Sequence, residues 1–331
     1  MWFREISNDS DVVISTRVRF ARSVDGFKFP HMLSAEENNA IVDLVSKSVN
    51  KKKYSVLKMN NIDEITKKSL VEQHLISKEF EINQNGALLA NTDNTIVTMI
   101  NEEDHLRIQS FCSGFNIDKC YNQLVDFTDE LNNKINFTES EKYGYITACP
   151  TNVGSAMRVS VMLHLPGLVK LGLLNKLLSQ ATSIGFAIRG YYGENSAGGG
   201  NMYQISNQKT LGISDQDIIY NIKTIVSSII EQERKARELL LNTNKYLEDS
   251  VYRSYGILKN ARIIGDEESL KLLSEVRLGV SSKILNDVDL LSIQKLMVDT
   301  KENTLKTILK ENFSNEEEDI KRAEYIRREL N

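Results

Sequence analysis

Cysteine, proline and long apolar runs are all scarce in this sequence. Its 331 residues include 3 cysteines and 3 prolines. An odd and small number of cysteines in a chain of this length argues against a disulfide framework and favours a reducing compartment. No stretch approaches the roughly 20 apolar residues that span a bilayer, and the first residues, MWFREISNDSDVV, carry charges where a signal peptide requires an apolar run. We therefore expect a soluble, cytoplasmic protein that does not act at a membrane.

A strong charge of one sign is absent as well. Lys and Arg total 41 against 45 for Asp and Glu, which gives a net charge of -4. A near-neutral chain is a poor candidate for a dedicated nucleic-acid binder, although a local basic pocket is compatible with it. Hydrophobic residues make up 41% and charged residues 26% of the chain. These values are those of a globular protein, and the length suffices for one large domain or two.

Motifs of several enzyme classes are missing. The sequence has no GxxxxGK(S/T) phosphate loop, no GxGxxG motif after a strand, and no HRD or DFG motif. Cys112, Cys120 and Cys149 form no CxxC pair, and the 4 histidines show no HExxH spacing. We therefore expect no zinc site and no metal held by protein ligands.

Hydrophobic periodicity predicts a mixed α/β body followed by a helical region. Strand patterns thin out after about Arg237, and amphipathic segments continue to the end of the chain. We therefore predict a catalytic domain over 12–236 and a helical C-terminal domain over 237–331. Strands are predicted at 12–20, 87–100 (two strands around a turn), 105–111, 145–148 and 202–206. Helices are predicted at 34–56, 62–76, 121–135, 155–165 (ended by Pro166) and 214–246, with a helix and then a strand over 179–188.

Five arginines stand at the start or in the middle of predicted elements. Arg17 and Arg19 are two apart on a strand and so project from one face, which by itself is equally compatible with a solvated surface. Arg107 lies on another strand, Arg158 lies in an apolar stretch, and Arg189 opens the glycine-rich segment RGYYGENSAGGGN. Guanidinium groups suit phosphate because their charge is permanent and their planar donors bind pairs of oxygens. Together these arginines predict a polyanion site, and MgATP is the natural small polyanion.

Three consecutive carboxylates, Glu102, Glu103 and Asp104, lie at a predicted turn. Taken alone, such a cluster is more often a solvated hairpin tip. Beside an arginine-lined anion site, a carboxylate could instead orient a cationic or weakly nucleophilic group for attack on phosphorus.

Cys149 is predicted to lie between the end of a strand and the start of a helix, in CPTNVGSAMR. A helix N-terminus stabilises a thiolate, so Cys149 is a candidate reactive thiol. A buried, inert cysteine is equally compatible with the sequence. Cys112 and Cys120 are interpreted as structural.

The chain contains six notable blocks of sequence: STRVRFAR (15–22), NEEDHLRI (101–108), CPTNVG (149–154), RVSVMLHLPGL (158–168), RGYYGE (189–194) and QISNQKTLG (204–212). In this order and spacing, the blocks resemble the catalytic domain of the phosphagen (ATP:guanidino) kinases over Val12 to about Arg237. Within that superfamily the chain looks most like the bacterial protein-arginine kinases. The first motif begins at Ser15, without the helical domain that precedes it in creatine and arginine kinases, and small-guanidine enzymes have no counterpart of the C-terminal helices. The resemblance implies an α+β fold, with an antiparallel sheet flanked by helices and a C-terminal helical domain.

The resemblance also implies roles for individual residues. Glu103 would accept the guanidinium proton, Glu194 would be its partner on the glycine-rich loop, and Cys149 would be the reactive cysteine near the substrate. ATP and Mg²⁺ would be the cofactors, with Mg²⁺ held mainly through phosphates and water. His74 would lie near the adenosine. The full set of residues implied in ATP binding is Ser15, Thr16, Arg17, Val18, Arg19, His74, Arg107, Arg158, Val159, Ser160, Val161, Met162, Arg189, Gly190, Tyr191, Tyr192, Gly193 and Glu194.

A second motif of the protein-arginine kinases binds phosphoarginine near the C-terminus and regulates activity. Asp319, Arg322 and Ala323 match it, but Glu318 stands where the motif has an arginine. The resemblance therefore does not decide whether this chain has a phosphoarginine pocket. The alternative is a charged helix that binds no ligand.

We therefore predict transfer of the ATP γ-phosphoryl group to arginine side chains of proteins, in stress response and proteolysis. The partners that the resemblance implies are protein substrates with exposed arginines, an activator protein, a stress-gene repressor and a Clp-type protease, and the chain would form a homodimer or higher oligomer. A small-molecule guanidino kinase, of the arginine or creatine type, would share every catalytic motif. A catalytically silent regulatory adaptor is the alternative that is not an enzyme.

Overall fold

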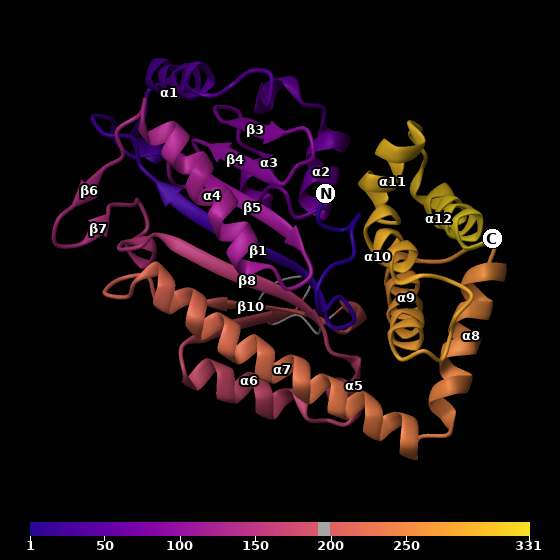
Figure 1. Cartoon of the computed structure of the whole chain (residues 1–331). Coiled ribbons are helices and arrows are strands. Elements are labelled where there is room, and N and C mark those ends of the chain that lie inside the picture. Colours follow the sequence, from indigo (N-terminus) through magenta and orange to yellow (C-terminus); the bar gives the residue numbers. More distant parts are fainter. Residues whose placement is uncertain (191–198) are drawn as a thin grey trace.

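A computed structural model describes residues 1–190 and 199–331 of the chain. Within these residues an eight-stranded sheet runs in the order β2-β3-β4-β5-β1-β8-β10-β9, with all neighbouring strands antiparallel (Figure 1). The predicted fold class, an antiparallel sheet flanked by helices and followed by a C-terminal helical region, is confirmed. The strands are β1 (Val13–Arg22), β2 (Tyr54–Lys58), β3 (Ala87–Asn91), β4 (Ile96–Ile100), β5 (Leu106–Ser113), β8 (Met157–His164), β9 (Phe186–Gly190) and β10 (Met202–Asn207), with a separate ribbon of β6 (Glu139–Ser140) and β7 (Gly144–Tyr145).

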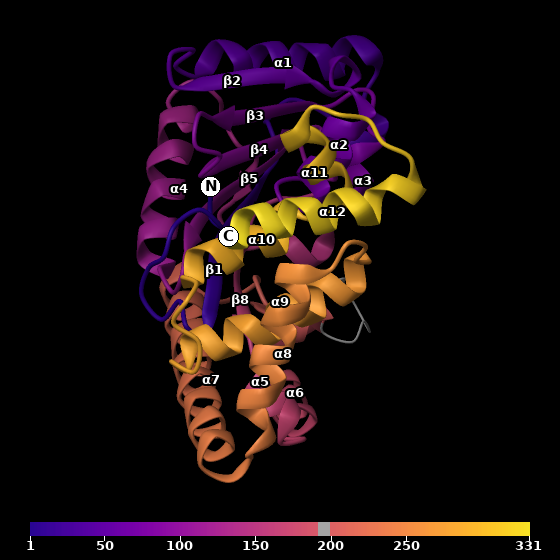
Figure 2. The same cartoon turned by 90° about the vertical axis from the view of Figure 1, so that its right-hand side faces the viewer.

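Helices lie on both faces of the sheet (Figures 1 and 2). None of the described helices is at once long and apolar enough to cross a membrane. The helices of the first part of the chain are α1 (Ala35–Ser48), α2 (Glu64–Glu72), α3 (Lys78–Glu81), α4 (Ile117–Asn132), α5 (Pro166–Lys170) and α6 (Leu174–Ser183). They are followed by α7 (Asp215–Thr243), α8 (Tyr246–Asn260), α9 (Asp266–Ser281), α10 (Leu290–Asp299), α11 (Glu302–Leu309) and α12 (Asn315–Leu330).

The larger core lies between one face of the sheet and helices that include α1, α4 and α7. Val18, Ile108 and Val161 point into it from β1, β5 and β8, and they meet Leu124 of α4 and Ile222 of α7. All five side chains are fully buried. Because successive side chains of a strand point to opposite faces, the sequence neighbours of Val18, Ile108 and Val161 point away from this core.

The opposite face of the sheet is partly covered by the C-terminal helices (Figure 2). Met99 and Phe111 of the sheet belong to one buried cluster with Leu273 of α9, Leu296 of α10 and Ile326 of α12. Full burial of side chains of this size contributes roughly 1.5–3 kcal/mol each. The C-terminal helices are therefore packed on the same face to which the polar residues of β1 and β5 point.

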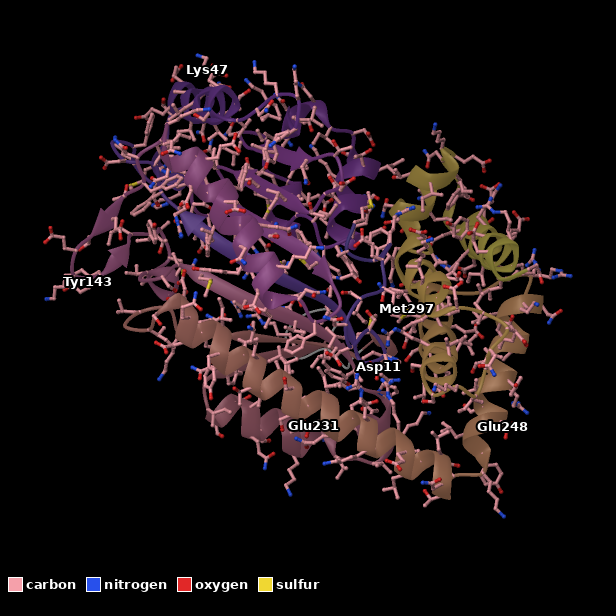
Figure 3. The ribbon with its side chains drawn as sticks, in the orientation of Figure 1. Asp11, Lys47, Tyr143, Glu231, Glu248 and Met297 are labelled. Atoms are coloured by element: carbon pink, nitrogen blue, oxygen red, sulfur yellow. The ribbon has the colours of Figure 1, made fainter. Side chains whose placement is uncertain are left out.

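Helix α7 joins the two predicted domains without a break. It runs from Asp215 to Thr243 and so passes through the predicted boundary at 236/237. Arg237 on this helix and Arg277 on α9 both donate to the carbonyl of Asp11, at 3.0 and 3.1 Å. Figure 3 labels Asp11 where the sheet and the C-terminal helices approach each other. The boundary itself stays a prediction.

Strand β8 shows that the helix predicted over 155–165 is wrong. The buried residues Met157, Val159, Val161 and Leu163 recur every second position, which is the period of a strand. Pro166 does not end a helix but begins α5. A proline at the first helical position loses no hydrogen bond, because that N–H has no partner in the helix.

The helix predicted over 34–56 is correct only in its first part. Ser34 caps α1: its hydroxyl accepts from Glu37 N at 3.2 Å, while Glu37 Oε2 accepts from Ser34 N at 2.8 Å. The helix ends at Ser48, and β2 follows at the edge of the sheet, paired with β3. Tyr54 and Val56 favour a strand.

Candidate active site

The five arginines singled out from the sequence line adjoining cavities on one side of the sheet. Four of them lie on the neighbouring strands β5, β1 and β8, and Arg189 lies on β9, beyond β10. Arg17 and Arg19 belong to β1, which has β5 with Arg107 on one side and β8 with Arg158 on the other. Arg19 lies directly opposite Arg158 across the β1–β8 pair. Like charges that face each other across strands destabilise a sheet, so this arrangement favours binding of an anion over stability of the unliganded protein.

Burial and mutual repulsion depress the pKa of these arginines. The pKa of Arg17 is lowered to about 9, first by burial and then by the charges of Arg107 and Arg158. Burial and Arg107 lower the pKa of Arg19 well below its usual range. Arg17 Nη2 donates to the neutral Gln204 Oε1 at 3.1 Å. A chain of phosphates would supply the negative charge that relieves this repulsion.

Glu102 is the carboxylate that orders one of these arginines. Its Oε1 accepts from Arg107 Nη1 and from the Ser77 hydroxyl, both at 2.6 Å. Burial raises the pKa of Glu102, but Arg107 and Ser77 outweigh burial, so that the net pKa is lowered. Ser77 also caps α3. Glu102 therefore joins β5 to the start of α3 and is itself fully engaged.

The two carboxylates that follow in the turn differ in environment. Glu103 is exposed, and in the described parts of the chain its carboxylate forms neither a hydrogen bond nor an ion pair. Asp104 is 2% exposed, and its Oδ1 accepts from the backbone N–H of Ala148 at 2.6 Å. Burial raises the pKa of Asp104 to about 6. Asp104 thus anchors the turn, while Glu103 presents a carboxylate to the cavity.

Cys149 lies at the edge of the same cavity and is half-buried. The strand before it is shorter than predicted, because β7 ends at Tyr145. After it comes only a short 3-10 helix, Pro150–Asn152, since 157–164 form β8. The argument that a helix dipole stabilises a thiolate at Cys149 therefore loses its basis. What supports a role for this thiol is its place in the cavity, with Sγ 3.0 Å from Thr151 Oγ1.

Two adjoining cavities occupy the arginine face. The Glu103 cavity, of about 310 Å³, is lined by Glu103, Cys149 and Arg158 among others. The His74 cavity, of about 460 Å³, is lined by His74 and Arg17 among others. The cavities share the residues Arg19, Ser77, Glu79, Arg107 and Arg189. The site is therefore elongated, with the Glu103 carboxylate at one end and arginines in the middle.

His74 follows the end of α2 in a left-handed backbone conformation, with φ of 59°. Burial, and after it the charges of Arg17 and Lys301, lower the pKa of His74 to about 4. The ring is therefore neutral at pH 7 and offers a polar but uncharged surface at its end of the site.

Only some of the remaining residues predicted to bind ATP line one of the two cavities. Gly190 and Met162 line the His74 cavity, and the Ser160 hydroxyl accepts from Arg17 Nε at 3.4 Å. Ser15 is paired with Met162 across β1 and β8. Val18, Val159 and Val161 line neither cavity, because their side chains are buried in the larger core. Thr16 also lines neither cavity, and its hydroxyl donates to the carbonyl of Gly114. Tyr191, Tyr192, Gly193 and Glu194 lie outside the described residues.

Sequence reasoning missed several residues of the site. Gln204 and Ser77 are partners of Arg17 and Glu102, and Lys301 lines the His74 cavity from the C-terminal helices. Gln204 could have been found, because it is the polar position between apolar ones on a predicted strand. Lys301 carried no signal in the sequence.

The residues that match a phosphoarginine motif lie on α12. Arg322 and Ala323 are buried. The Arg322 guanidinium pairs with Glu318 and with Asp319. In this chain, therefore, Glu318 supplies a carboxylate to the arginine from within the same helix.

Across residues 1–190 and 199–331, no three His, Cys, Asp or Glu side chains come together as a metal site would require.

Two family models match successive parts of this chain. The family model described as ATP:guanido phosphotransferase, C-terminal catalytic domain, matches residues 36–236. The model described as Protein-arginine kinase McsB C-terminal domain matches residues 244–331. Curated relatives include the protein-arginine kinase of Clostridium tetani, 40% identical over 99% of this chain and 98% of its own length. The protein-arginine kinase of Clostridium acetobutylicum is 42% identical over 99% of both chains.

Solved structures share the fold over about two thirds to three quarters of the chain. The duplicated taurocyamine kinase from Schistosoma mansoni, with bound transition state analog components, superposes with a TM-score of 0.61 at 29% identity. The match covers 68% of this chain but 33% of that longer one. Lombricine kinase superposes with a TM-score of 0.61 over 75% of this chain and 72% of its own length, and at 20% identity it supports the fold alone.

Proposed function

This chain belongs to the ATP:guanido phosphotransferase family, in its protein-arginine kinase branch, and we propose that its arginine face holds ATP while Glu103 presents an arginine side chain of a protein to the γ-phosphorus. The observation that supports this division of roles most strongly is the position of Glu103. Its carboxylate, which has no polar partner among the described residues, borders the same cavity as Arg107, Arg158 and Arg189. An acceptor bound by Glu103 would therefore lie next to the groups that attract phosphate.

ATP binding falls to the five arginines and to the His74 cavity. Guanidinium groups placed on rigid strands would spread the charge of the transferring phosphoryl group without having to move during the reaction. The adenosine would lie beside the neutral His74. ATP would enter as its Mg²⁺ complex, which adds positive charge at the phosphates, with the ion held through phosphate oxygens and water. The residues proposed to bind ATP through side chains are Arg17, Arg19, His74, Arg107, Arg158, Met162 and Arg189.

Acceptor activation falls to Glu103. A free guanidinium has a pKa above 12 and a delocalised lone pair, so it is a poor nucleophile. Glu103 would accept a hydrogen bond from one terminal nitrogen, orient that nitrogen towards the γ-phosphorus and take its proton. As the N–P bond forms, the bond from the γ-phosphorus to the bridging oxygen breaks and ADP leaves. Cys149 and Glu194 would position the guanidinium from other sides.

A phosphoarginine pocket on α12 belongs to the proposal only in a modified form. Arg322 is already engaged by Glu318 and Asp319. A phosphoarginine bound near Arg322 and Ala323 would have to displace the Glu318 carboxylate, at the cost of breaking a buried ion pair.

We extend the proposal to the cellular setting that the resemblance implies. The chain would act in the cytoplasm, as a homodimer or higher oligomer, on proteins with exposed arginines. Its other partners would be an activator protein, a stress-gene repressor and a Clp-type protease. A catalytic domain over 12–236 and a helical domain over 237–331 would divide these tasks.

The experiment that tests the proposed function compares acceptors. The protein is incubated with MgATP and either a denatured, arginine-containing protein or free arginine. The phosphate that remains bound to the acceptor is then measured after treatment with acid and, separately, with base. A phosphorus–nitrogen bond on protein arginine is labile to acid and survives base. Acid-labile phosphate on the protein acceptor supports the proposal. Phosphorylation of free arginine with no transfer to protein would instead favour the small-guanidine alternative.

A further inference from the structure

A lysine of the C-terminal helices lines the His74 cavity. Lys301 lies between α10 and α11 and is 6% exposed. It borders the same cavity as Arg17 and His74, which belong to the sheet and to the end of α2. Its charge helps to lower the pKa of His74, after burial and Arg17. The cavity is therefore walled from both parts of the chain.

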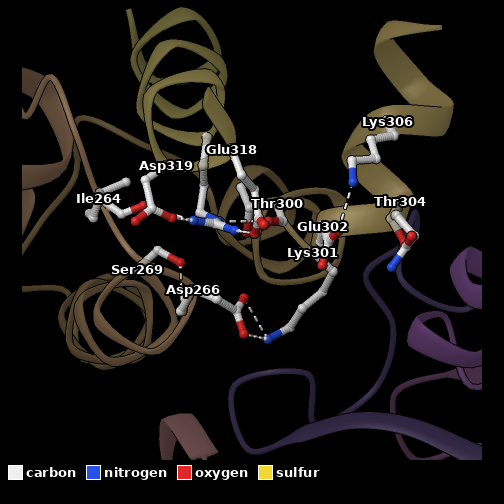
Figure 4. A network of polar contacts seen from close by, with 12 residues as sticks. Ile264, Asp266, Ser269, Thr300, Lys301, Glu302, Thr304, Lys306, Glu318 and Asp319 are labelled. Atoms are coloured by element: carbon white, nitrogen blue, oxygen red, sulfur yellow. Dashed lines mark hydrogen bonds and ion pairs between the residues drawn. The ribbon is translucent and has the colours of Figure 1, made fainter. Parts of the chain in front are cut away.

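An ion pair holds the Lys301 ammonium in place (Figure 4). Its Nζ lies 2.9 Å from each carboxylate oxygen of Asp266, the first residue of α9. Lysines are rarely buried unless they are paired. The pair fixes the position of a positive charge at the wall of the cavity.

A single guanidinium holds the backbone on both sides of this ion pair. Arg322 Nε donates to the carbonyl of Thr300 at 3.0 Å, directly before Lys301. Its Nη1 donates to the carbonyl of Ile264 at 2.8 Å, two residues before Asp266. Because a buried charge is costly unless its donors are satisfied, these contacts define one arrangement of the Lys301 turn (Figure 4).

The same turn is fastened to α2, the helix that leads to His74. Glu72 accepts from the backbone N–H of Asn303 at 3.1 Å and from that of Thr304 at 2.7 Å, and so caps the start of α11. Ser69 of α2 donates to the Thr304 hydroxyl at 3.3 Å. Lys301 is thus held in register with the cavity wall that α2 supplies.

We propose that Lys301 binds the nucleotide directly, so that the C-terminal helices complete the ATP site. This inference rests on the proposed function of the cavity. Lys301 and His74 line the His74 cavity but not the Glu103 cavity, and so they lie away from the acceptor and from the γ-phosphate. An ammonium there suits the α-phosphate and ribose oxygens, which ATP and ADP share. Such a contact is equally strong before and during transfer, so it lowers KM and leaves kcat unchanged.

Equilibrium binding of ATP and of ADP to the full chain, by calorimetry, tests this assignment. Lys301→Gln should weaken both nucleotides by the same factor, about tenfold or more, the effect of losing a charged hydrogen bond. Lys301→Arg should retain most of the affinity. Lys306→Gln is the matched control, because Lys306 is 9% exposed and ion-paired to Glu302 at 2.6 Å but lines neither cavity. It should leave both dissociation constants unchanged.

Asp266→Asn separates nucleotide binding from a purely structural role. It removes the negative charge but keeps an amide oxygen that can accept a hydrogen bond from the Lys301 ammonium, so it should retain ATP affinity while Lys301→Gln loses it. Equal losses in Lys301→Gln, Asp266→Asn and Lys306→Gln would show loosened packing and overturn the inference, as would a wild-type dissociation constant in Lys301→Gln. If the wild-type chain binds no ATP, the proposed function fails and this inference fails with it. If wild type binds ATP and Lys301→Gln binds equally well, only this inference fails.

Discussion

The Asp104 carboxylate accepts the backbone N–H of Ala148 at 2.6 Å. This bond joins the turn that carries Glu103 to the segment that carries Cys149. Two groups proposed to contact the acceptor are therefore positioned by one buried side chain, which itself forms part of the wall of the Glu103 cavity.

Asp104→Asn should stabilise the protein at neutral pH. The pKa of Asp104 is raised to about 6 in the folded state, from 3.8 when unfolded. Because the pKa is higher in the folded state, the neutral carboxyl group contributes its full stabilisation below pH 3.8. This stabilisation is lost as the pH rises through 6. The loss is about 3 kcal/mol in total. Asparagine does not ionise, so its contribution does not change with pH. In urea unfolding, the free energy of unfolding of the variant minus that of wild type should therefore increase by about 1–2 kcal/mol from pH 5 to pH 8. A difference in the free energy of unfolding between the two proteins that does not change with pH would contradict this.

Arg19→Gln should make the unliganded protein more stable and the liganded protein less so. The change removes one of two like charges that face each other across β1 and β8, for which we expect about 0.5–1 kcal/mol. Thermal unfolding without and with MgATP measures both effects. The melting temperature should rise without nucleotide, and its increase on adding MgATP should shrink. Arg253→Gln, an exposed change on α8, is the control and should alter neither value.

Arg189→Lys should lower kcat more than it changes KM for ATP. Lysine keeps the charge but replaces a planar pair of donors by a single point. We expect a loss of about 10²–10³-fold in kcat, as for removal of one donor to a transition-state oxyanion. Steady-state kinetics over a range of ATP concentrations decides the point. Weaker ATP binding with an unchanged kcat would count against a role in the transition state.

Cys149 should be alkylated faster than the other two thiols, and bound ATP should slow that reaction. Cys149 is half-buried at the cavity, whereas Cys112 and Cys120 are buried. Cys149→Ser should reduce transfer without abolishing it, because phosphate passes directly to the guanidinium. Mass spectrometry of peptides alkylated with and without ATP gives the order of reaction. Faster modification of Cys112 or Cys120, or a trapped phosphocysteine, would refute this account of Cys149.

Local sequence rules predicted several elements correctly. Ser34 and Glu37 form a capping box at the start of α1, and β3 and β4 pair around the turn predicted within 87–100. The helix predicted over 155–165 is a strand in the structure, because a short apolar run is compatible with either helix or strand. Arg158 was nevertheless assigned to the anion site, since an isolated charge in an apolar run needs a partner in either structure.

Contacts between distant parts of the chain were beyond sequence reasoning. The Arg19–Arg158 opposition depends on strand register, and the bond from Asp104 to Ala148 spans two loops. Lys301 meets His74 only because the C-terminal helices pack over the sheet face. The difference in environment between Glu103 and Asp104, which are adjacent in the sequence, also depends on burial in the folded chain.

The most direct test of the central assignment is Glu103→Gln, with ATP binding and transfer to a denatured protein measured on the same preparation. Glutamine keeps the shape of the side chain but cannot accept the proton, so transfer should fall by about 10²–10⁴-fold while the dissociation constant for ATP stays at its wild-type value. Glu81→Gln at the end of α3, which lines neither cavity, should change neither quantity. Transfer by Glu103→Gln at a rate near that of wild type would contradict the assignment.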